Sequence, residues 1–163
     1  MKSFYEFYEK LIIENDVLVD KMASHLHDDW RKSRLKSGTH GNEDAVYEPR
    51  MKDSGVGDGS EIDIAQHYSK LTPKWQAENK AAAQAALSLV RGAVSSGKNL
   101  ESLSMGSELE RLASGVHDAW MSRNPKADYN ANQHVPYSSL PENEKQKDRD
   151  HVLIAIKLLS NEQ

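Results

Sequence analysis

Two stretches of the sequence decide the fold: ASHLHDDW at residues 23–30 and ASGVHDAW at residues 113–120. Both keep the order His-Asp-x-Trp. Residues three positions apart lie on the same face of a helix, so the pattern places His27 beside Trp30 and His117 beside Trp120. A motif that recurs within one chain indicates an internal repeat. We therefore expect two divergent copies of one helical unit.

A second shared pattern follows each copy. The first copy has YSKL at residues 68–71 and then Thr72-Pro73, while the second has YSSL at residues 137–140 and then Pro141. Thr as a cap and Pro in the first turn are typical of a helix start, and an alanine-rich helix is predicted over residues 73–94. The sequence thus predicts a mainly α fold with short β-hairpins, in which two pseudo-symmetric helix–loop/hairpin–helix units pack on one core.

Breaks in the apolar pattern give the expected boundaries. The run SSGKN at residues 95–99 separates the copies, so residues 1–96 hold an N-terminal helix and the first copy, and residues 97–163 hold the second. Residues 37–59 and 125–136 lack helical periodicity. We expect both to be irregular connections, the first with a short β-hairpin.

Capping signals predict where helices begin. The segments SFYE at residues 3–6 and SELE at residues 107–110 both match a capping box, in which Ser and Glu satisfy the first amides of a helix. The first helix is expected to end near Glu14. Asn15 or Asp16 is then expected to cap a second helix that runs through the first His-Asp-x-Trp motif.

The composition of the 163 residues fits a globular protein, with 37% hydrophobic and 28% charged residues. A formal net charge of −4 argues against a general nucleic-acid binder, which needs a basic face. The lack of cysteine excludes disulfides and cysteine-ligated zinc. The first residues do not resemble a signal peptide, and no apolar run reaches the roughly 20 residues that span a membrane. We expect a cytoplasmic protein without membrane association.

Three segments of the second copy occur in the order seen in the ryanodine receptor (RyR) repeat domain family. They are HDAWM at residues 117–121, VPYSSLP at 135–141 and EKQKDR at 144–149, and the chain resembles this family from about Leu109 to Leu159. The likeness is to the free-standing bacterial and phage type. The family's Gly-Trp-x-Tyr-Gly segment and His-Pro are absent from residues 124–134, which puts a pocket shaped by those residues in doubt.

The first copy resembles the family less closely. Its Tyr47-Glu48-Pro49-Arg50 and Trp75-Gln76-Ala77-Glu78-Asn79 are similar to the first units that accompany such domains in microbial proteins. The resemblance implies a peripheral, non-enzymatic module without a cofactor or established catalytic residues. In microbes it implies a sensor, or a protein that sequesters a nucleotide-derived ligand such as an ADP-ribose-like molecule.

The residue types around each motif suit such a ligand. An indole face can hold an aromatic base, and an Arg can hold phosphate. Our candidate ligand-binding residues are His27, Trp30, Arg34, Tyr47, Arg50, His117, Trp120, Arg123, Tyr137 and Lys145. The alternative for each motif is that His donates a structural hydrogen bond to the following loop while Trp fills the core. Arg50 either clamps a phosphate or carboxylate or pairs with an aspartate of the repeat.

Two charged segments also leave alternatives open. Residues 142–150 form either a solvated helical turn or a segment that turns Lys145 or Arg149 toward a cleft near Trp120. The acidic residues between Asp53 and Asp63 suggest a solvated loop more than a calcium site, because their spacing does not match an EF-hand. The adjoining glycines lack the Lys-Ser/Thr end of a phosphate loop, and no His-Glu-x-x-His helix is present, so neither a metal site nor a catalytic residue is predicted.

Two other function classes remain open. One is a protein–protein interaction or structural module, including a homo-oligomer, without a small ligand. The other is an enzyme that acts on an ADP-ribose-like substrate, which would need a carboxylate or His with a strongly shifted pKa inside the cleft.

Overall fold

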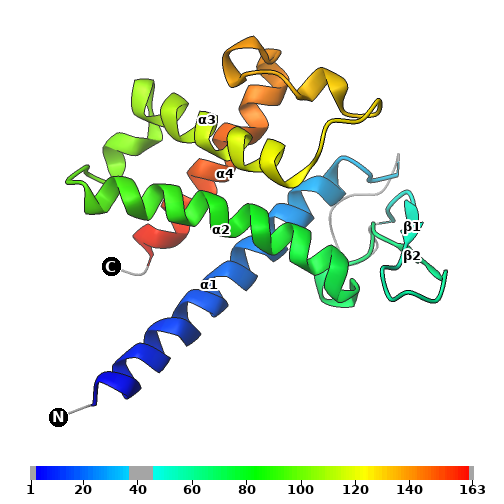
Figure 1. Cartoon of the computed structure of the whole chain (residues 1–163), viewed down its shortest axis with the longest axis horizontal. Coiled ribbons are helices and arrows are strands. Elements are labelled where there is room, and N and C mark those ends of the chain that lie inside the picture. Colours follow the sequence, from blue (N-terminus) through cyan, green and yellow to red (C-terminus); the bar gives the residue numbers. More distant parts are fainter. Residues whose placement is uncertain (1–2, 37–45, 162–163) are drawn as a thin grey trace. The chain divides into compact units, whose positions relative to one another are not determined.

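The computed structural model describes residues 3–36 and 46–161, except for the side chains of residues 7, 8 and 11–13. The described chain is mainly helical with one small antiparallel hairpin, which confirms the predicted fold class (Figure 1). The elements are α1 (Phe4–Lys32), β1 (Met51–Asp53), β2 (Glu61–Asp63), α2 (Pro73–Ser95), α3 (Gly106–Arg123) and α4 (Glu142–Ser160). Short 3₁₀ turns join them, namely η1 (Tyr68–Lys70), η2 (Glu101–Ser104), η3 (Ala131–Gln133) and η4 (Tyr137–Ser139).

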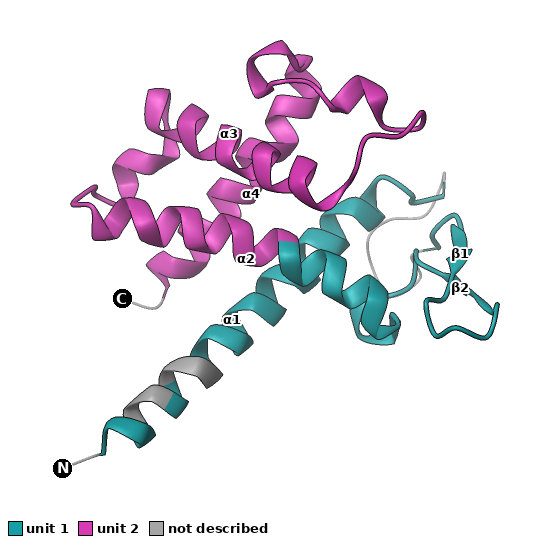
Figure 2. Ribbon diagram, viewed as in Figure 1, with its two compact units in different colours: residues 1–81 teal, residues 82–163 magenta. Residues whose placement is uncertain are grey.

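The chain divides into two compact units, residues 1–81 and residues 82–163 (Figure 2). This division falls within α2, whereas the boundary between the sequence copies, placed at residue 96, and the repeat itself stay predictions. Within the described residues, no helix has both the length and the apolar character needed to cross a membrane.

Helix α1 is one continuous helix, so the break predicted at Asn15 or Asp16 is wrong. The capping box at its start is confirmed, because Ser3 Oγ accepts from the Glu6 amide and the Glu6 carboxylate accepts from the Ser3 amide. Asn and Asp inside a helix cost less than about 1 kcal/mol relative to Ala, and no Gly or Pro stands nearby to end the helix. The buried residues of the second half are Leu18, Val19, Met22, Ala23, Leu26 and His27.

The first unit closes over the second half of α1 with the segment that follows the hairpin. Its other buried residues are Ser54, Ile64, Ala65, Tyr68 and Leu71. The strands pair with Lys52 opposite Ile62. The side chain of Thr72, the predicted cap, contacts the hairpin segment instead of the helix, because its hydroxyl donates to the Ser54 carbonyl at 2.6 Å. The Trp75 indole N–H likewise donates to the Asp53 carbonyl at 2.9 Å, so the hairpin is fastened to the start of α2.

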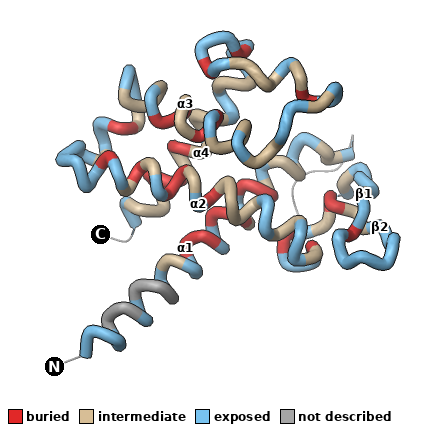
Figure 3. The backbone as a smooth tube through the Cα atoms, viewed as in Figure 1, coloured by how far each residue is buried: buried red, intermediate tan, exposed pale blue. Residues whose placement is uncertain are grey.

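The second unit buries one face of each of its helices (Figure 3). Its fully buried large side chains are Leu87, Val90, Leu103, Leu112 and Val152. Gly115 lets α2 approach α3, because a Cβ there would lie 3.0 Å from both Leu89 methyl carbons. The capping box predicted at residues 107–110 is wrong: Met105 occupies the cap position, without a side-chain cap bond. Glu110 is therefore left available for other contacts.

Candidate functional site

The two His-Asp-x-Trp motifs have the same local geometry. Each His donates from Nε2 to a backbone carbonyl of the following loop, His27 to Gln66 and His117 to Val135, both at 2.7 Å. Each imidazole also stacks on its Trp, with ring centroids 5.6 Å apart for His27 and Trp30 and 5.9 Å apart in the second unit. The structural hydrogen bond expected of each His is thus confirmed, but the indoles are half-buried rather than part of the core.

A second pair of clusters extends this likeness. The Tyr68 hydroxyl donates to Asp20 at 3.0 Å, and Lys80 lies 3.5 Å from the same carboxylate. In the second unit, Tyr137 and Arg149 both bind Glu110. Burial and the neighbouring carboxylate raise the pKa of both tyrosines, to about 12 for Tyr137.

These clusters involve residues that sequence reasoning missed. Asp20 and Glu110 both stand seven positions before the motif His, and this shared spacing is the signal that could have found them. Matching contacts are what two copies of one unit would produce. The repeat itself stays a prediction, and Asp20 and Glu110 are the residues that this likeness would add to it.

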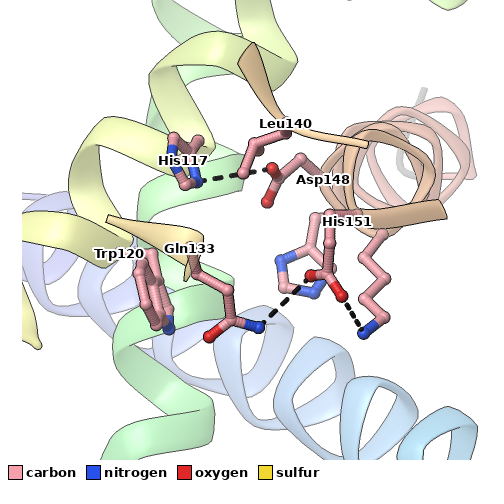
Figure 4. Close-up of a pocket in the computed structure, with 8 residues that line it drawn as sticks. His117, Trp120, Gln133, Leu140, Asp148 and His151 are labelled. Carbon is pink, nitrogen blue, oxygen red and sulfur yellow. Dashed lines mark hydrogen bonds and ion pairs between the residues drawn. The ribbon is translucent and has the colours of Figure 1, made fainter. Parts of the chain in front are cut away.

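A concave cavity of about 210 Å³ lies in the second unit beside His117 and Trp120 (Figure 4). Helix α3 contributes these two rings, and the loop before α4 contributes Gln133 and Leu140. Helix α4 contributes the remaining lining residues, Glu144, Lys147, Asp148 and His151. Their spacing puts them on one face of that helix. The cavity therefore has an aromatic wall opposite a polar one.

The two carboxylates of the polar wall, Glu144 and Asp148, differ in how many hydrogen-bond donors they have. Glu144 accepts from Lys147 Nζ at 2.9 Å and from the Gln133 amide at 3.4 Å. Asp148, whose side chain is 15% exposed, lies 3.7 Å from His117 Nδ1. Burial raises the pKa of Asp148 to about 6, against the attraction of His117, which lowers it. Asp148 is thus the side chain of the cavity with the most strongly altered acid–base behaviour in the described structure.

Asp148→Asn should stabilise the empty protein at neutral pH. Folded Asp148 holds its proton up to about pH 6, whereas an unfolded chain releases it near the ordinary value of 3.8. The folded state binds more protons between these values, so stability falls as pH rises through them and stays lower above them. We expect the variant to raise the free energy of unfolding by about 1–3 kcal/mol at pH 7.5, with no gain at pH 3.5. Urea denaturation at both pH values measures this, and equal stability at pH 7.5 would contradict it.

The structure brings together only some of the residues predicted in the first unit. The Arg34 guanidinium lies 5.6 Å from the centre of the Trp30 ring. However, it donates to the carbonyls of Glu48 and Pro49 at 2.9 and 3.0 Å, so it holds the following segment in place.

Tyr47 and Arg50 have other surroundings. The ring of Tyr47 packs under the Arg31 guanidinium, at 4.1 Å, rather than under Arg34. Arg50 is exposed, and it is its backbone amide that donates to Asp63, at 2.8 Å. The choice between a phosphate clamp and an ion pair for the Arg50 side chain stays open.

In the second unit, only His117 and Trp120 of the predicted residues line the cavity. Lys145 Nζ lies 5.6 Å from the ring of Tyr137, and the Tyr137 hydroxyl donates to Glu110, away from the cavity lining. Arg123 is half-buried, and its Nε has no hydrogen-bond partner among the described residues.

Of the two alternatives for the charged start of α4, the one that turns Lys145 or Arg149 toward the cavity is wrong, since neither residue lines it. Arg149 binds Glu110 and Glu142, and α4 presents Lys147 and Asp148 to the cavity in its place. The sequence signal that could have found this face is the spacing of Glu144, Lys147, Asp148 and His151 along a predicted helix.

The aspartates of the acidic hairpin accept hydrogen bonds from nearby backbone amides. Asp53 and Asp58 accept from the amides two residues later, and Asp63 accepts from the Arg50 and Ala65 amides. Within the described residues, no group of three or more His, Asp or Glu side chains is arranged to hold a metal ion. Comparison of the chain with protein-family models and with curated protein sequences gave no match, so the cavity itself has to indicate the chemistry.

Proposed function

We propose that this chain is a non-enzymatic RyR-like module that binds one nucleotide-derived small molecule in the cavity beside His117 and Trp120. The proposal rests on the finding that three separate segments of the chain meet at one cavity. The three segments that resemble the RyR repeat, residues 117–121, 135–141 and 144–149, all contribute lining residues to this one cavity. An aromatic wall with a few fixed polar groups is the usual composition of a small-molecule site.

The size of the cavity limits what it encloses. Its volume of about 210 Å³ is below the roughly 300–1,000 Å³ of sites that enclose a drug-sized ligand. One ring system fits, stacked on the half-buried Trp120 indole. Because the polar wall carries Glu144 and Asp148 and one lysine already paired with Glu144, phosphates are disfavoured there. We infer that the base enters the cavity and that sugar and phosphate stay at its rim.

Ligand binding tests the proposal. The compounds are ADP-ribose, cyclic ADP-ribose, NAD, ATP and cyclic dinucleotides, followed by thermal shift and calorimetry. A compound at about 100 times its Kd should add roughly 2.7 kcal/mol of stability. Trp120→Ala should weaken binding about tenfold or more, because the stacking surface is lost.

Trp30→Ala is the matched control, since Trp30 stacks on His27 in the same way but lies in the other unit. It should leave the affinity unchanged. If no compound raises the melting temperature, or if both Trp variants lose affinity equally, the cavity is not the nucleotide site. The first of these results would favour a protein partner.

A hydrolase is the second candidate, and Asp148 is the observation that favours it. A half-buried carboxylate whose pKa is raised to about 6, backed by His117, has the properties of a general base at neutral pH. It would take a proton from the water that attacks the N-glycosidic carbon of NAD, while the C–N bond breaks and the positively charged nicotinamide leaves with the bonding electrons as the neutral base. Incubation with NAD and ADP-ribose, followed by chromatography, decides the matter. Turnover that Asp148→Asn abolishes without loss of binding would favour the enzyme.

A further inference from the structure

Asp148 is a half-buried hydrogen-bond acceptor that lacks a donor among the described residues. Among the described residues its carboxylate accepts no hydrogen bond, and its one close polar neighbour is His117 Nδ1 at 3.7 Å. A carboxylate with so little exposed surface is costly without donors. Figure 4 shows Asp148 on α4 facing His117 on α3, and both side chains line the cavity. A donor can therefore reach it from the cavity.

The hydrogen bonding of His117 fixes what faces Asp148. Nε2 must carry a hydrogen, because its partner at 2.7 Å is the carbonyl of Val135, which can only accept. Nδ1, the other ring nitrogen, lies 3.7 Å from the Asp148 carboxylate, beyond the length of a hydrogen bond. Ionised Asp148 is thus left to find its donor on the other side, from a molecule in the cavity.

The other charged groups around the cavity do not compete for this role. Those that face Asp148 are His117 on α3 and Glu144, Lys147 and His151 on α4, and the loop before α4 contributes only the uncharged Gln133 and Leu140. Glu144 already accepts two hydrogen bonds, from Gln133 and Lys147. Asp148 is therefore the carboxylate with capacity for a ligand.

We propose that ionised Asp148 accepts a hydrogen bond from an amino N–H of the base stacked on Trp120, so that the site selects amino-bearing nucleobases and releases them in acid. This inference rests on the proposed function, because it needs a base in the cavity. When Asp148 is protonated, the carboxyl group loses its negative charge, and its remaining carbonyl oxygen accepts the ligand's hydrogen bond more weakly. A phosphate at the same place would show the opposite behaviour, since it binds better to a protonated carboxyl group.

The first unit offers a natural contrast. Counted from the shared Tyr-x-x-Leu segment, the position of Asp148 corresponds to Asn79. The Asn79 amide donates to the Trp75 carbonyl of its own helix, at 3.1 Å. The first unit keeps the imidazole bond and the indole stack but has no carboxylate at this place. Amino-group selection is thus expected of the second unit alone.

The experiment measures the affinity for adenosine, guanosine and N6,N6-dimethyladenosine by calorimetry from pH 8 to pH 5. Dimethyladenosine keeps the ring but lacks the amino hydrogens. Because the carboxyl group takes up its proton at a pKa of about 6, adenosine should bind about tenfold more weakly at pH 5 than at pH 7.5. Dimethyladenosine should bind more weakly than adenosine at pH 7.5. Asp148→Asn should remove the pH dependence, whereas Asn79→Asp should not change it.

The outcomes separate the two proposals. Affinity that is unchanged or stronger at pH 5, or equal affinity for both adenosines, would overturn the role of Asp148. If that binding is still lost in Trp120→Ala, the cavity remains the ligand site. Binding of none of the three nucleosides, and of none of the larger compounds, would overturn both the proposed function and this inference.

Discussion

Leu103→Ala should lower the free energy of unfolding by about 2–5 kcal/mol, the range for a leucine removed from a close-packed core. Leu103 is 0% exposed although it belongs to a short 3₁₀ turn rather than to a long helix. That turn, η2, packs against both α3 and α4. The lost side chain leaves a space at this junction that helices on either side cannot easily fill. Urea denaturation followed by circular dichroism measures the loss.

Met105→Ala is the matched control, because Met105 lies two residues further on and is 68% exposed. A change of less than about 0.5 kcal/mol is expected there. If Leu103→Ala cost no more than Met105→Ala, then η2 would not be part of the core of the second unit, and the packing described for it would be incorrect.

His117→Ala should lower the free energy of unfolding by about 2–4 kcal/mol at pH 7.5. The ring is 3% exposed, so its removal opens a space and leaves the Val135 carbonyl without its donor. It also removes the ring on which Trp120 stacks. Denaturation by urea gives the stability, and near-ultraviolet circular dichroism reports the environment of the indole.

His27→Ala is the companion variant, because His27 is 5% exposed and makes the same bond at the same distance. Burial lowers the pKa of His27, which favours the neutral form of its ring at this pH. Losses within about 1 kcal/mol of each other are expected if the motif has one structural role in both units. A loss under about 0.5 kcal/mol in either variant would show that the hydrogen bond does not hold the loop in that unit.

Local sequence signals predicted the helices better than their ends. The apolar spacing and the proline near residue 73 correctly gave α2, and the first capping box correctly gave the start of α1. Asn15-Asp16 and the second capping box gave false boundaries. A cap contributes about 1 kcal/mol, and a helix whose second half is buried by tertiary contacts overrides a signal of that size.

The candidate site was predictable only in part, and the reason is geometric. The spacing of His117 and Trp120 shows that they are neighbours, because that depends on one helix. Which charges of residues 142–150 face them depends on how α4 packs against α3, and no local pattern contains that information. Asp148 and Arg149 are adjacent in sequence, yet one lines the cavity and the other binds Glu110.

Asp148 also bears on what this sequence was selected for. An ionised carboxylate in a half-closed space makes the empty protein less stable than an amide would. The first unit shows that a chain with the same histidine bond tolerates Asn at the corresponding position. Selection for stability alone would favour the amide in both places. Proteins often keep such unstable positions where activity depends on them, so an acid at residue 148 is what the proposed ligand site in the second unit would require.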